Sequence, residues 1–379
     1  MRNLLFSTLS IGLGVTAANA GIPVVDGTLD SSYGDQIAFQ NTSTNFGDSS
    51  DGHAGYANGS ELDVASATIA GGSLFLHFGG NLESNYNKLE IFIDGRDGGQ
   101  NRILGINPDV SLGALQRMGD DGNGNGLTFD AGFEADLYIA IGCGDNGNSD
   151  GIIYYVDYAQ LRTDGSGTGG YAGSGTTSQD AKGVVTVTPS DGDHGIHVGI
   201  NNSNAGGVLG GTGPDCGAPD GNVVATGIEI EIPLSLIDWD FDGLPFDNVR
   251  ICAFINDSGH GHVSNQVLGG IGGGDNLGEP RDVDFNDIDG AQNLRLGVVA
   301  SPCVGAVLGA CCFANGDCWQ GLTATACDDN RGLFGGEDSL CENCDLGGGN
   351  DCPTDIDGDG ETDVDDLLQL IGNFGNPCV

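Results

Sequence analysis

Basic side chains are scarce in this chain. Lysine and arginine together number 11 against 54 aspartates and glutamates, which gives a formal net charge of -43. A surface this negative repels the phosphate backbone of nucleic acids and disfavours anionic membranes, so we expect neither as a partner. Long apolar runs are also missing beyond the first 20 residues, and no stretch approaches the roughly 20 apolar residues of a spanning helix. We therefore expect no membrane span.

Recognisable catalytic motifs are missing too. The chain contains no G-x-S-x-G, no H-E-x-x-H, no phosphate-binding loop and no Cys/His nucleophile pair. Carboxylates are so abundant that an acid pair for general acid–base catalysis stays open, although no pair stands out. These absences favour a protein without catalytic activity.

The first 20 residues carry an export signal. A basic start at Met1-Arg2-Asn3 precedes an apolar run from Leu4 to Val15 and the small-residue motif Ala18-Asn19-Ala20. This order predicts a signal peptide over residues 1–20 and a mature chain that begins at Gly21. We expect the protein to be secreted, either extracellular or at the cell surface.

The 12 cysteines are unevenly distributed, and their placement predicts domain boundaries. In an exported chain they indicate disulfides rather than reduced thiols. Cys143, Cys216 and Cys252 are scattered, whereas nine lie between Cys303 and Cys378. We predict a large domain over 21–300, a disulfide-rich module over 301–346, a linker over 347–351 and a C-terminal unit over 352–379.

Residues 21–300 show strand-like alternation of apolar and polar side chains. Ile228, Ile230 and Ile232 alternate with Glu229 and Glu231 in the clearest segment. Glycine accounts for 70 of 379 residues, far above its usual share of about 7%, and supplies turns between short segments. This pattern predicts a mainly β fold, an antiparallel β-sandwich of the jelly-roll type. Similar alternation occurs in segments 74–78, 89–93, 137–141, 249–255 and 294–298.

Three short segments of this domain, in order, resemble family-nine carbohydrate-binding modules and related DOMON-like sandwiches. They are the opening Pro23–Asp30, the central Leu89–Asp94 and the late Gly227–Pro233. The resemblance implies a sandwich fold and a sugar ligand held between aromatic faces. The chain offers two tryptophans for that purpose, with tyrosines as substitutes, and core or edge packing is the alternative role for each of these aromatics: Trp239, Trp319, Tyr154, Tyr155 and Tyr158.

An acidic loop near the C-terminus has the spacing of a calcium site. Seven carboxylates fall within the twelve residues 355–366, and such crowding is relieved when a dication lies among them. Gly360 occupies the sixth position, where an EF-hand loop turns sharply. The predicted calcium ligands are the side chains of Asp355, Asp357, Asp359, Asp363 and Asp366 and the backbone carbonyl of Glu361.

The residues after this loop predict a short exit helix. Val364, Leu367, Leu368 and Ile371 recur at helical spacing, and Asn376-Pro377 ends the pattern. A calcium loop with only an exit helix resembles one repeat of a type I dockerin, as found on secreted bacterial modular proteins. The resemblance implies calcium binding and a protein docking partner for the tail.

The cysteine-rich segment resembles a small module that occurs beside dockerin-like tails in secreted bacterial proteins. Three disulfides within it are the preferred interpretation, and the pairing stays open. Zinc at Cys341 and Cys344 is the alternative. The disulfide candidates are Cys311, Cys312, Cys318, Cys327, Cys341 and Cys344, together with Cys352 and Cys378, which bracket the calcium unit.

Two further acidic loops and two histidine pairs remain ambiguous. Loops 121–126 and 238–243 copy the first half of a calcium loop but lack the closing acid, and Asp/Asn–Gly turns are the alternative. His194 with His197, and His260 with His262, lack an evident third metal ligand. We interpret these histidines as exposed loop residues.

These observations favour a secreted, non-catalytic, calcium-binding modular protein. Its sandwich would present a surface for a ligand such as a glycan or an extracellular matrix component, and its tail would serve in docking or anchoring. Two alternatives stay open. One is a polysaccharide-degrading hydrolase or lyase with a dockerin-like tail, and the other is a surface structural protein bridged by calcium.

Overall fold

The protein is described here by a computed structural model. The described residues are 21–34, 36–40, 44, 60–145, 152–176, 184–186, 188–189, 194–202, 224–237, 249–271, 275–296, 308–312, 318–323 and 333–334. The predicted signal peptide, the linker and the predicted calcium unit lie outside these residues.

One sheet of the large domain has six strands, and all of its strand pairs are antiparallel. In spatial order it consists of β1 (Gln36–Phe39), β2 (Glu61–Ala70), β3 (Ser73–Asn81), β11 (Gly227–Pro233), β10 (His197–Asn201) and β8 (Val184–Thr186). The segment predicted as a late strand ending in proline is therefore β11, and it lies in the middle of this sheet.

The second sheet has eight strands and is also antiparallel. Its order is β13 (Val263–Val267), β12 (Arg250–Asn256), β4 (Asn85–Asp94), β5 (Leu137–Asp145), β6 (Ile152–Gln160), β7 (Gly169–Thr176) and β9 (Thr188–Pro189), with β14 (Leu294–Arg295) paired to β12. These two sheets confirm the mainly β prediction.

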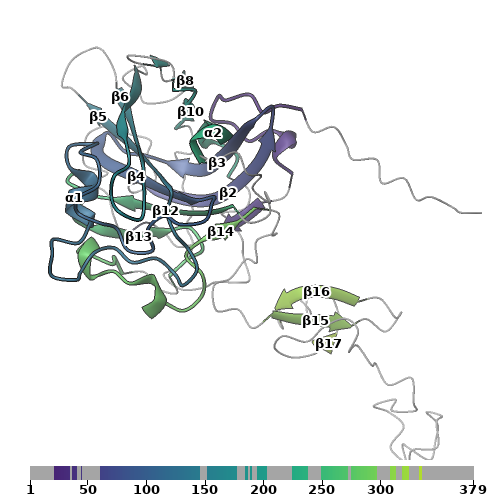
Figure 1. Cartoon of the computed structure of the whole chain (residues 1–379). Coiled ribbons are helices and arrows are strands. Elements are labelled where there is room, and N and C mark those ends of the chain that lie inside the picture. The colour runs from purple at the N-terminus through teal and green to yellow at the C-terminus, as the bar shows by residue number, and fades with distance from the viewer. Residues whose placement is uncertain are drawn as a thin grey trace, which may run out of the picture.

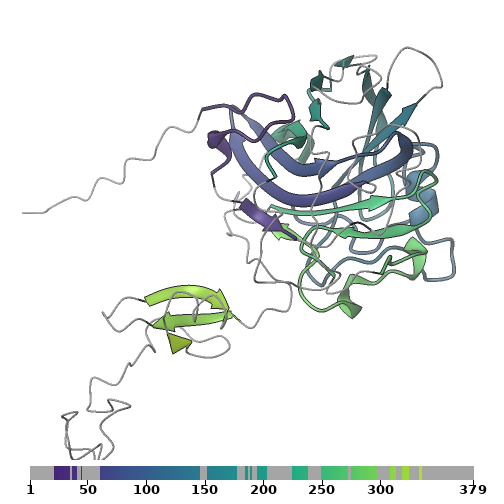
Figure 2. The same ribbon diagram turned by 180° about the vertical axis from the view of Figure 1, so that it is seen from behind.

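Apolar side chains from both sheets form one core. Ile228, Ile230 and Ile232 of β11 belong to the same buried cluster as Leu89 and Ile91 of β4. Alternate residues of a strand point to the same face, so the period-two pattern places every second side chain in this core. Burying each such side chain contributes roughly 1.5–3 kcal/mol. Figures 1 and 2 show the two large sheets from opposite sides.

A second core covers the outer face of the eight-stranded sheet. Phe92, Tyr138 and Phe254 are fully buried there, against residues of the segments that include α1 (Ala114–Met118) and η6 (Phe285–Asp287). The adjacent short helix is η5 (Pro280–Asp282), and the remaining ones are η1 (Ser31–Tyr33) and α2 (Leu234–Ile237). The central strands of this sheet are therefore buried on both faces.

The scattered cysteines correct one prediction. Cys143 and Cys252 are buried thiols rather than disulfide partners. Cys143 belongs to the core between the sheets, and Cys252 belongs to the core on the outer face. The eight-stranded sheet separates the two side chains, so they do not pair.

A third, separate sheet contains β15 (Leu308–Cys312), β16 (Cys318–Thr323) and β17 (Leu333–Phe334). Cys312 lies opposite Cys318 in the backbone register. Cys312 is buried and disulfide-bonded, and the pairing within the module stays a prediction. Among the residues that the structure describes, no helix is long and apolar enough to cross a membrane.

Candidate functional site

The direction of two strands brings two loops together at one edge of the eight-stranded sheet. β4 and β6 both pair with β5 in antiparallel fashion, so they run the same way and end at the same edge. The residues that follow β4 and those that follow β6 consequently meet there. They enclose an open pocket of about 450 Å³, lined by Arg96, Asp97, Gly98, Gly99, Arg162, Thr163 and Asp164.

Arg96 is held in place by two residues that do not line the pocket, Asp136 and Leu161. Its Nε lies 3.0 Å from Asp136 Oδ1, and its Nη2 donates to the carbonyl oxygen of Leu161 at 3.1 Å. Asp136 is only 2% exposed, and its Oδ2 accepts hydrogen bonds from the backbone N–H groups of Gly95 and Arg96. These contacts fix the guanidinium before any ligand arrives, which reduces the entropy lost on binding.

Two carboxyl groups near this edge titrate close to neutral pH. Burial raises the pKa of Asp136 to about 7, with Asp94 adding to the rise and the Gly95 N–H and Arg96 opposing it. Burial likewise raises the pKa of Asp94 to about 6. Asp136 does not line the pocket, so its contacts with Arg96 make it a positioning residue.

A buried glutamine ties the two pocket loops together, and a glycine fixes the backbone of the first loop. Gln100 Nε2 donates to the carbonyl oxygen of Arg162 at 2.6 Å and to Asn107 Oδ1 at 2.7 Å. Gly99 has φ +94°, and a Cβ there would lie 2.6 Å from the carbonyl oxygen of Glu134. Only glycine fits that position, so the backbone of this loop is closely defined.

The pocket combines hydrogen-bonding side chains with an apolar neighbour. Arginine supplies donors, aspartate supplies acceptors and Thr163 supplies a hydroxyl that does both. Ile106 is 73% exposed, and its Cγ1 and Cδ1 lie against Gly165, directly after the lining residue Asp164. Such a surface can bind a molecule that carries hydroxyl groups and an apolar face.

A second polar cluster lies on the outer face of the same sheet. Glu90 is fully buried and bonds to Tyr138 Oη at 2.6 Å, His260 Nδ1 at 2.6 Å and Asn256 Nδ2 at 3.2 Å. His260 Nε2 also donates to the carbonyl oxygen of Ser111 at 2.8 Å. Both ring nitrogens of His260 therefore face oxygen atoms.

Backbone strain is concentrated around this cluster. The described non-glycine residues with positive φ are Tyr86 (69°), Ser111 (47°), Leu112 (60°) and His260 (58°). Ser111 and His260 bond to each other, and Lys88 Nζ donates to the carbonyl oxygen of Tyr86 at 2.8 Å. Residues in this conformation each cost on the order of 1–3 kcal/mol, so the surrounding contacts must hold them.

Glycine makes room for the lysine of this cluster. Lys88 lies opposite Gly142 of β5, and a Cβ at Gly142 would be 2.7 Å from Lys88 Nζ. Burial lowers the pKa of Lys88, and burial raises the pKa of the nearby Asp157. Each group partly offsets the effect on the other through its charge.

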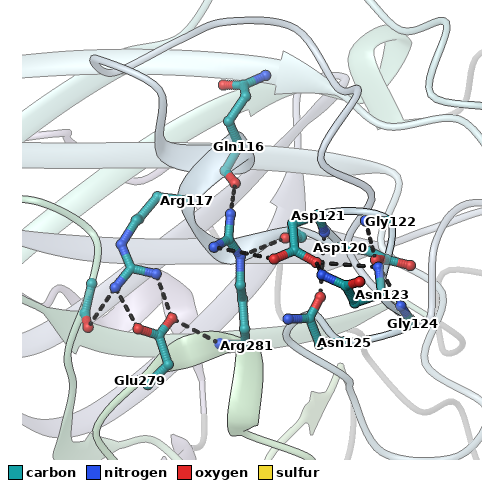
Figure 3. A network of polar contacts seen from close by, with 12 residues as sticks. Gln116, Arg117, Asp120, Asp121, Gly122, Asn123, Gly124, Asn125, Glu279 and Arg281 are labelled. Atoms are coloured by element: carbon teal, nitrogen blue, oxygen red, sulfur yellow. Dashed lines mark hydrogen bonds and ion pairs between the residues drawn. The ribbon is translucent and has the colours of Figure 1, made fainter.

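The loop that copies half of a calcium site is a set of tight turns (Figure 3). Asp120 Oδ1 accepts from the backbone N–H groups of Gly122 at 2.7 Å and Gly124 at 3.0 Å. Asp121 Oδ1 accepts from Asn123 Nδ2 at 2.9 Å, and its Oδ2 lies 3.9 Å from Arg281. These side-chain oxygens thus bind loop donors, as the turn interpretation predicts. The described residues contain no group of three or more His, Cys, Asp or Glu arranged to hold a metal ion.

The histidine pairs have separate partners. His194 Nδ1 bonds to Tyr158 Oη at 3.0 Å, whereas His197 Nδ1 bonds to Glu231 Oε2 at 2.8 Å. The interpretation as exposed loop residues is wrong for His260, which is buried and bonds to the buried Glu90. It is also wrong for His197, which belongs to β10 and is half-buried.

The tyrosines considered for sugar binding differ in burial. Tyr154 is fully buried in the core between the sheets, so core packing is its role. Tyr155 and Tyr158 are half-buried. Trp239 lies outside the described residues, as do all six predicted calcium ligands, Asp355, Asp357, Asp359, Glu361, Asp363 and Asp366.

Arg96, Arg162 and Gln100 were not predicted as site residues. Their signal is weak in a sequence, because the two arginines come together only when the strand order is known. Scarcity of basic residues is the one available hint, since two of the 11 in the chain line a single pocket.

Comparison with protein-family models, with curated proteins and with solved structures finds no match to this chain.

Proposed function

We propose that this chain is a secreted, non-catalytic, calcium-binding modular protein. Its large domain binds a hydroxyl-rich ligand, such as a glycan or a component of the extracellular matrix. Its dockerin-like tail binds calcium and serves in docking to a protein partner or in anchoring. The proposal includes the jelly-roll connectivity of the large domain and the disulfide-rich module between that domain and the tail.

The observation that carries the binding function is the pocket formed by the loops after β4 and β6. Its lining includes two arginines and two aspartates, so it has no net charge although the chain is strongly acidic. A phosphate-rich ligand would be repelled by the rest of the surface. A neutral ligand with several hydroxyl groups meets both donors and acceptors in this pocket.

Two features support a ring-shaped ligand. The guanidinium of Arg96 is already oriented by Asp136 and by the carbonyl oxygen of Leu161. Ile106 offers exposed apolar surface beside Gly165. A sugar ring has hydroxyl groups around its edge and C–H groups on its faces, so it complements both features.

The calcium function is supported by the sequence of the tail. Five aspartates and one backbone carbonyl fall at the ligand positions of an EF-hand loop, with glycine at the sixth position. Calcium would neutralise part of this crowded charge and order the loop, because metal binding and folding are coupled in such units.

A glycan-binding measurement tests the pocket. The mature chain, residues 21–379, is screened against neutral, acidic and amino-sugar oligosaccharides, and any binder is titrated by calorimetry. We expect a neutral oligosaccharide to bind, and we expect Arg162→Ala and Thr163→Ala to weaken it at least tenfold. Arg295→Ala is the matched control, because it removes the same charge from an exposed residue of β14 outside the pocket lining. Unchanged affinity in both pocket variants, or no binding in the screen, would contradict the proposal.

A further inference from the structure

Three polar side chains form a row across the outer face of the six-stranded sheet. Ser66 of β2 is in register with His77 of β3, and His77 is in register with Glu229 of β11. Residues in register on adjacent strands point to the same side of a sheet. The neighbouring residues Leu76 and Ile228 belong to the core between the sheets, so the row lies on the opposite face.

The N-terminal segment of the domain covers this row. The backbone N–H groups of Asp26, Gly27 and Thr28 donate to Glu229 Oε2 at 2.7, 2.7 and 3.3 Å. The Tyr33 ring centroid lies 6.0 Å from that of His77. As a result, Ser66 is 1% exposed, and His77 and Glu229 are 0% exposed.

A glycine allows the segment to lie close to the sheet. Gly199 of β10 is in register with Glu229 and therefore continues the row by one strand. A Cβ at Gly199 would lie 2.6 Å from the carbonyl carbon of Val25. The covering segment therefore passes directly over Gly199, the one position of the row that has no side chain.

Four polar atoms under this cover lack a well-formed hydrogen bond. They are Ser66 Oγ, His77 Nδ1, His77 Nε2 and Glu229 Oε1. His77 has only a weaker contact with the backbone of Ala225, and Glu229 one with the side chain of Tyr33. Leaving a buried polar group unsatisfied costs about 1–3 kcal/mol, and four such atoms in one place are rare in a folded protein. Their grouping indicates that something absent from the protein chain itself satisfies them.

The chemistry of the four atoms defines the class of ligand. Burial lowers the pKa of His77 to about 4, so the ring is neutral at pH 7. One of its nitrogens then donates a hydrogen bond, and the other accepts a hydrogen bond. Ser66 Oγ both donates and accepts, and Glu229 Oε1 accepts. A metal cation cannot accept a hydrogen bond from an N–H group, and an anion is repelled by Glu229. Only a small neutral molecule that both donates and accepts suits all four atoms.

We propose that Ser66, His77 and Glu229 enclose an internal water site, holding one or two molecules beneath the segment 25–33. Internal waters of this kind make about three hydrogen bonds each to polar groups that the protein leaves unpaired. Here they join three adjacent strands to the segment that covers them. The proposal is independent of the ligand pocket and of the calcium tail.

A crystal structure of the mature chain tests the site directly. We expect solvent density within hydrogen-bond distance of Glu229 Oε1 and of Ser66 Oγ or a His77 ring nitrogen. The proposal is overturned if these atoms bond to one another or to other protein groups with no solvent between them. It is equally overturned if the space contains no density.

A stability measurement gives a second, independent test. Ser66→Ala removes a hydroxyl without adding bulk, and we expect it to lower the urea midpoint because the water loses a partner. Ser73→Ala is the reference variant. Ser73 Oγ donates a hydrogen bond to Glu231 Oε1 at 2.8 Å, and losing this bond should also lower the urea midpoint. An unchanged or higher midpoint for Ser66→Ala would show that the hydroxyl has no partner and would refute the site.

Discussion

Glu229 Oε2 accepts a hydrogen bond from the backbone N–H of Gly27 at 2.7 Å, across 202 positions of sequence. The same oxygen also accepts from the backbone N–H groups of Asp26 and Thr28. In addition, the N–H of Gly227 donates to the carbonyl oxygen of Gly27 at 2.9 Å. The beginning of the domain is therefore fastened to a central strand that forms near its end. The opening segment Pro23–Asp30 and the late segment Gly227–Pro233 therefore meet at this contact.

Two features require glycine at position 27, a positive φ and the lack of space for a Cβ, and a control variant can separate them. Its φ is +80°, and a Cβ would lie 2.3 Å from the backbone nitrogen of Asn201. We expect Gly27→Ala to lower the free energy of unfolding by roughly 3 kcal/mol or more, because strain and overlap add. Gly72→Ala is the control, with φ +91° and no atom within 4 Å, and should cost only about 1 kcal/mol. Equal losses in urea denaturation would contradict the steric explanation.

The carboxylate of Glu229 accepts three backbone hydrogen bonds, which oppose the rise that burial causes in its pKa. Hydrogen bonds from N–H groups to a carboxylate are stronger than those to a neutral oxygen, so we expect Glu229→Gln to lower the free energy of unfolding by about 1–3 kcal/mol. Glu231→Gln, on the same strand but half-buried, is the matched control and should cost less. Urea denaturation of both variants at neutral pH makes the comparison. A Glu229→Gln protein as stable as the wild type would show that the three bonds do not need a charged acceptor.

The raised pKa of Asp136 predicts that this residue makes the folded protein less stable as the pH rises, which is the reverse of the usual effect of an aspartate. Burial raises its pKa from 3.8 to about 7 in the folded protein. Between these values the folded protein holds the proton more tightly than the unfolded chain does. The stability that Asp136 contributes is therefore complete below about pH 4 and is lost as the pH rises towards 7, by an amount on the order of a few kcal/mol.

The variant Asp136→Asn isolates this dependence. It cannot ionise, so its free energy of unfolding should fall less steeply between about pH 4 and pH 7 than that of the wild type. His77 acts in the opposite direction, because burial lowers its pKa to about 4, but it is present in both proteins. Asp94 also titrates in this range and interacts with Asp136, so the difference between the two denaturation series reports Asp136 together with its coupling to Asp94. Parallel curves would mean that the carboxyl titrates normally in the folded state.

Because Asp136 orients Arg96, we also expect Asp136 to affect ligand binding in the pocket. Asp136→Asn leaves the lining residues unchanged but weakens the contact that orients Arg96. We expect a ligand that depends on Arg162 and Thr163 to bind this variant several-fold more weakly, with little change in the folded structure. Calorimetric titration at one fixed pH, with circular dichroism as the folding check, makes this measurement. Wild-type affinity would show that Arg96 needs no support from Asp136.

Side-chain alternation predicts the inner faces of the strands well. Ile228, Ile230 and Ile232 lie in the core, as their spacing indicates. The same alternation suggests that Glu229 and Glu90 face solvent, yet both are fully buried. Each is covered by a segment distant in sequence, residues 25–33 for Glu229 and the loop that contains His260 for Glu90. Alternation reports which face a side chain takes, but not what covers that face.

The pocket could not be predicted for a related reason. Arg96 and Arg162 are 66 positions apart, and nothing local in the sequence links them. They meet because β4 and β6 flank β5 and end at the same edge, which depends on strand order. Local turn chemistry was easier to predict, since the Asp–Gly and Asn–Gly steps of residues 120–126 adopt the expected turns.

Calcium binding by the tail is the claim on which the modular function depends, and isothermal titration tests it most directly. Calcium is titrated into the chelator-treated mature chain and into the double variant Asp355→Ala with Asp366→Ala, which lacks the first and last ligands of the loop. The account predicts saturable calcium uptake by the wild type and loss of one bound ion in the double variant. A wild-type chain that takes up no calcium, or a double variant that binds as many ions as the wild type, would contradict it.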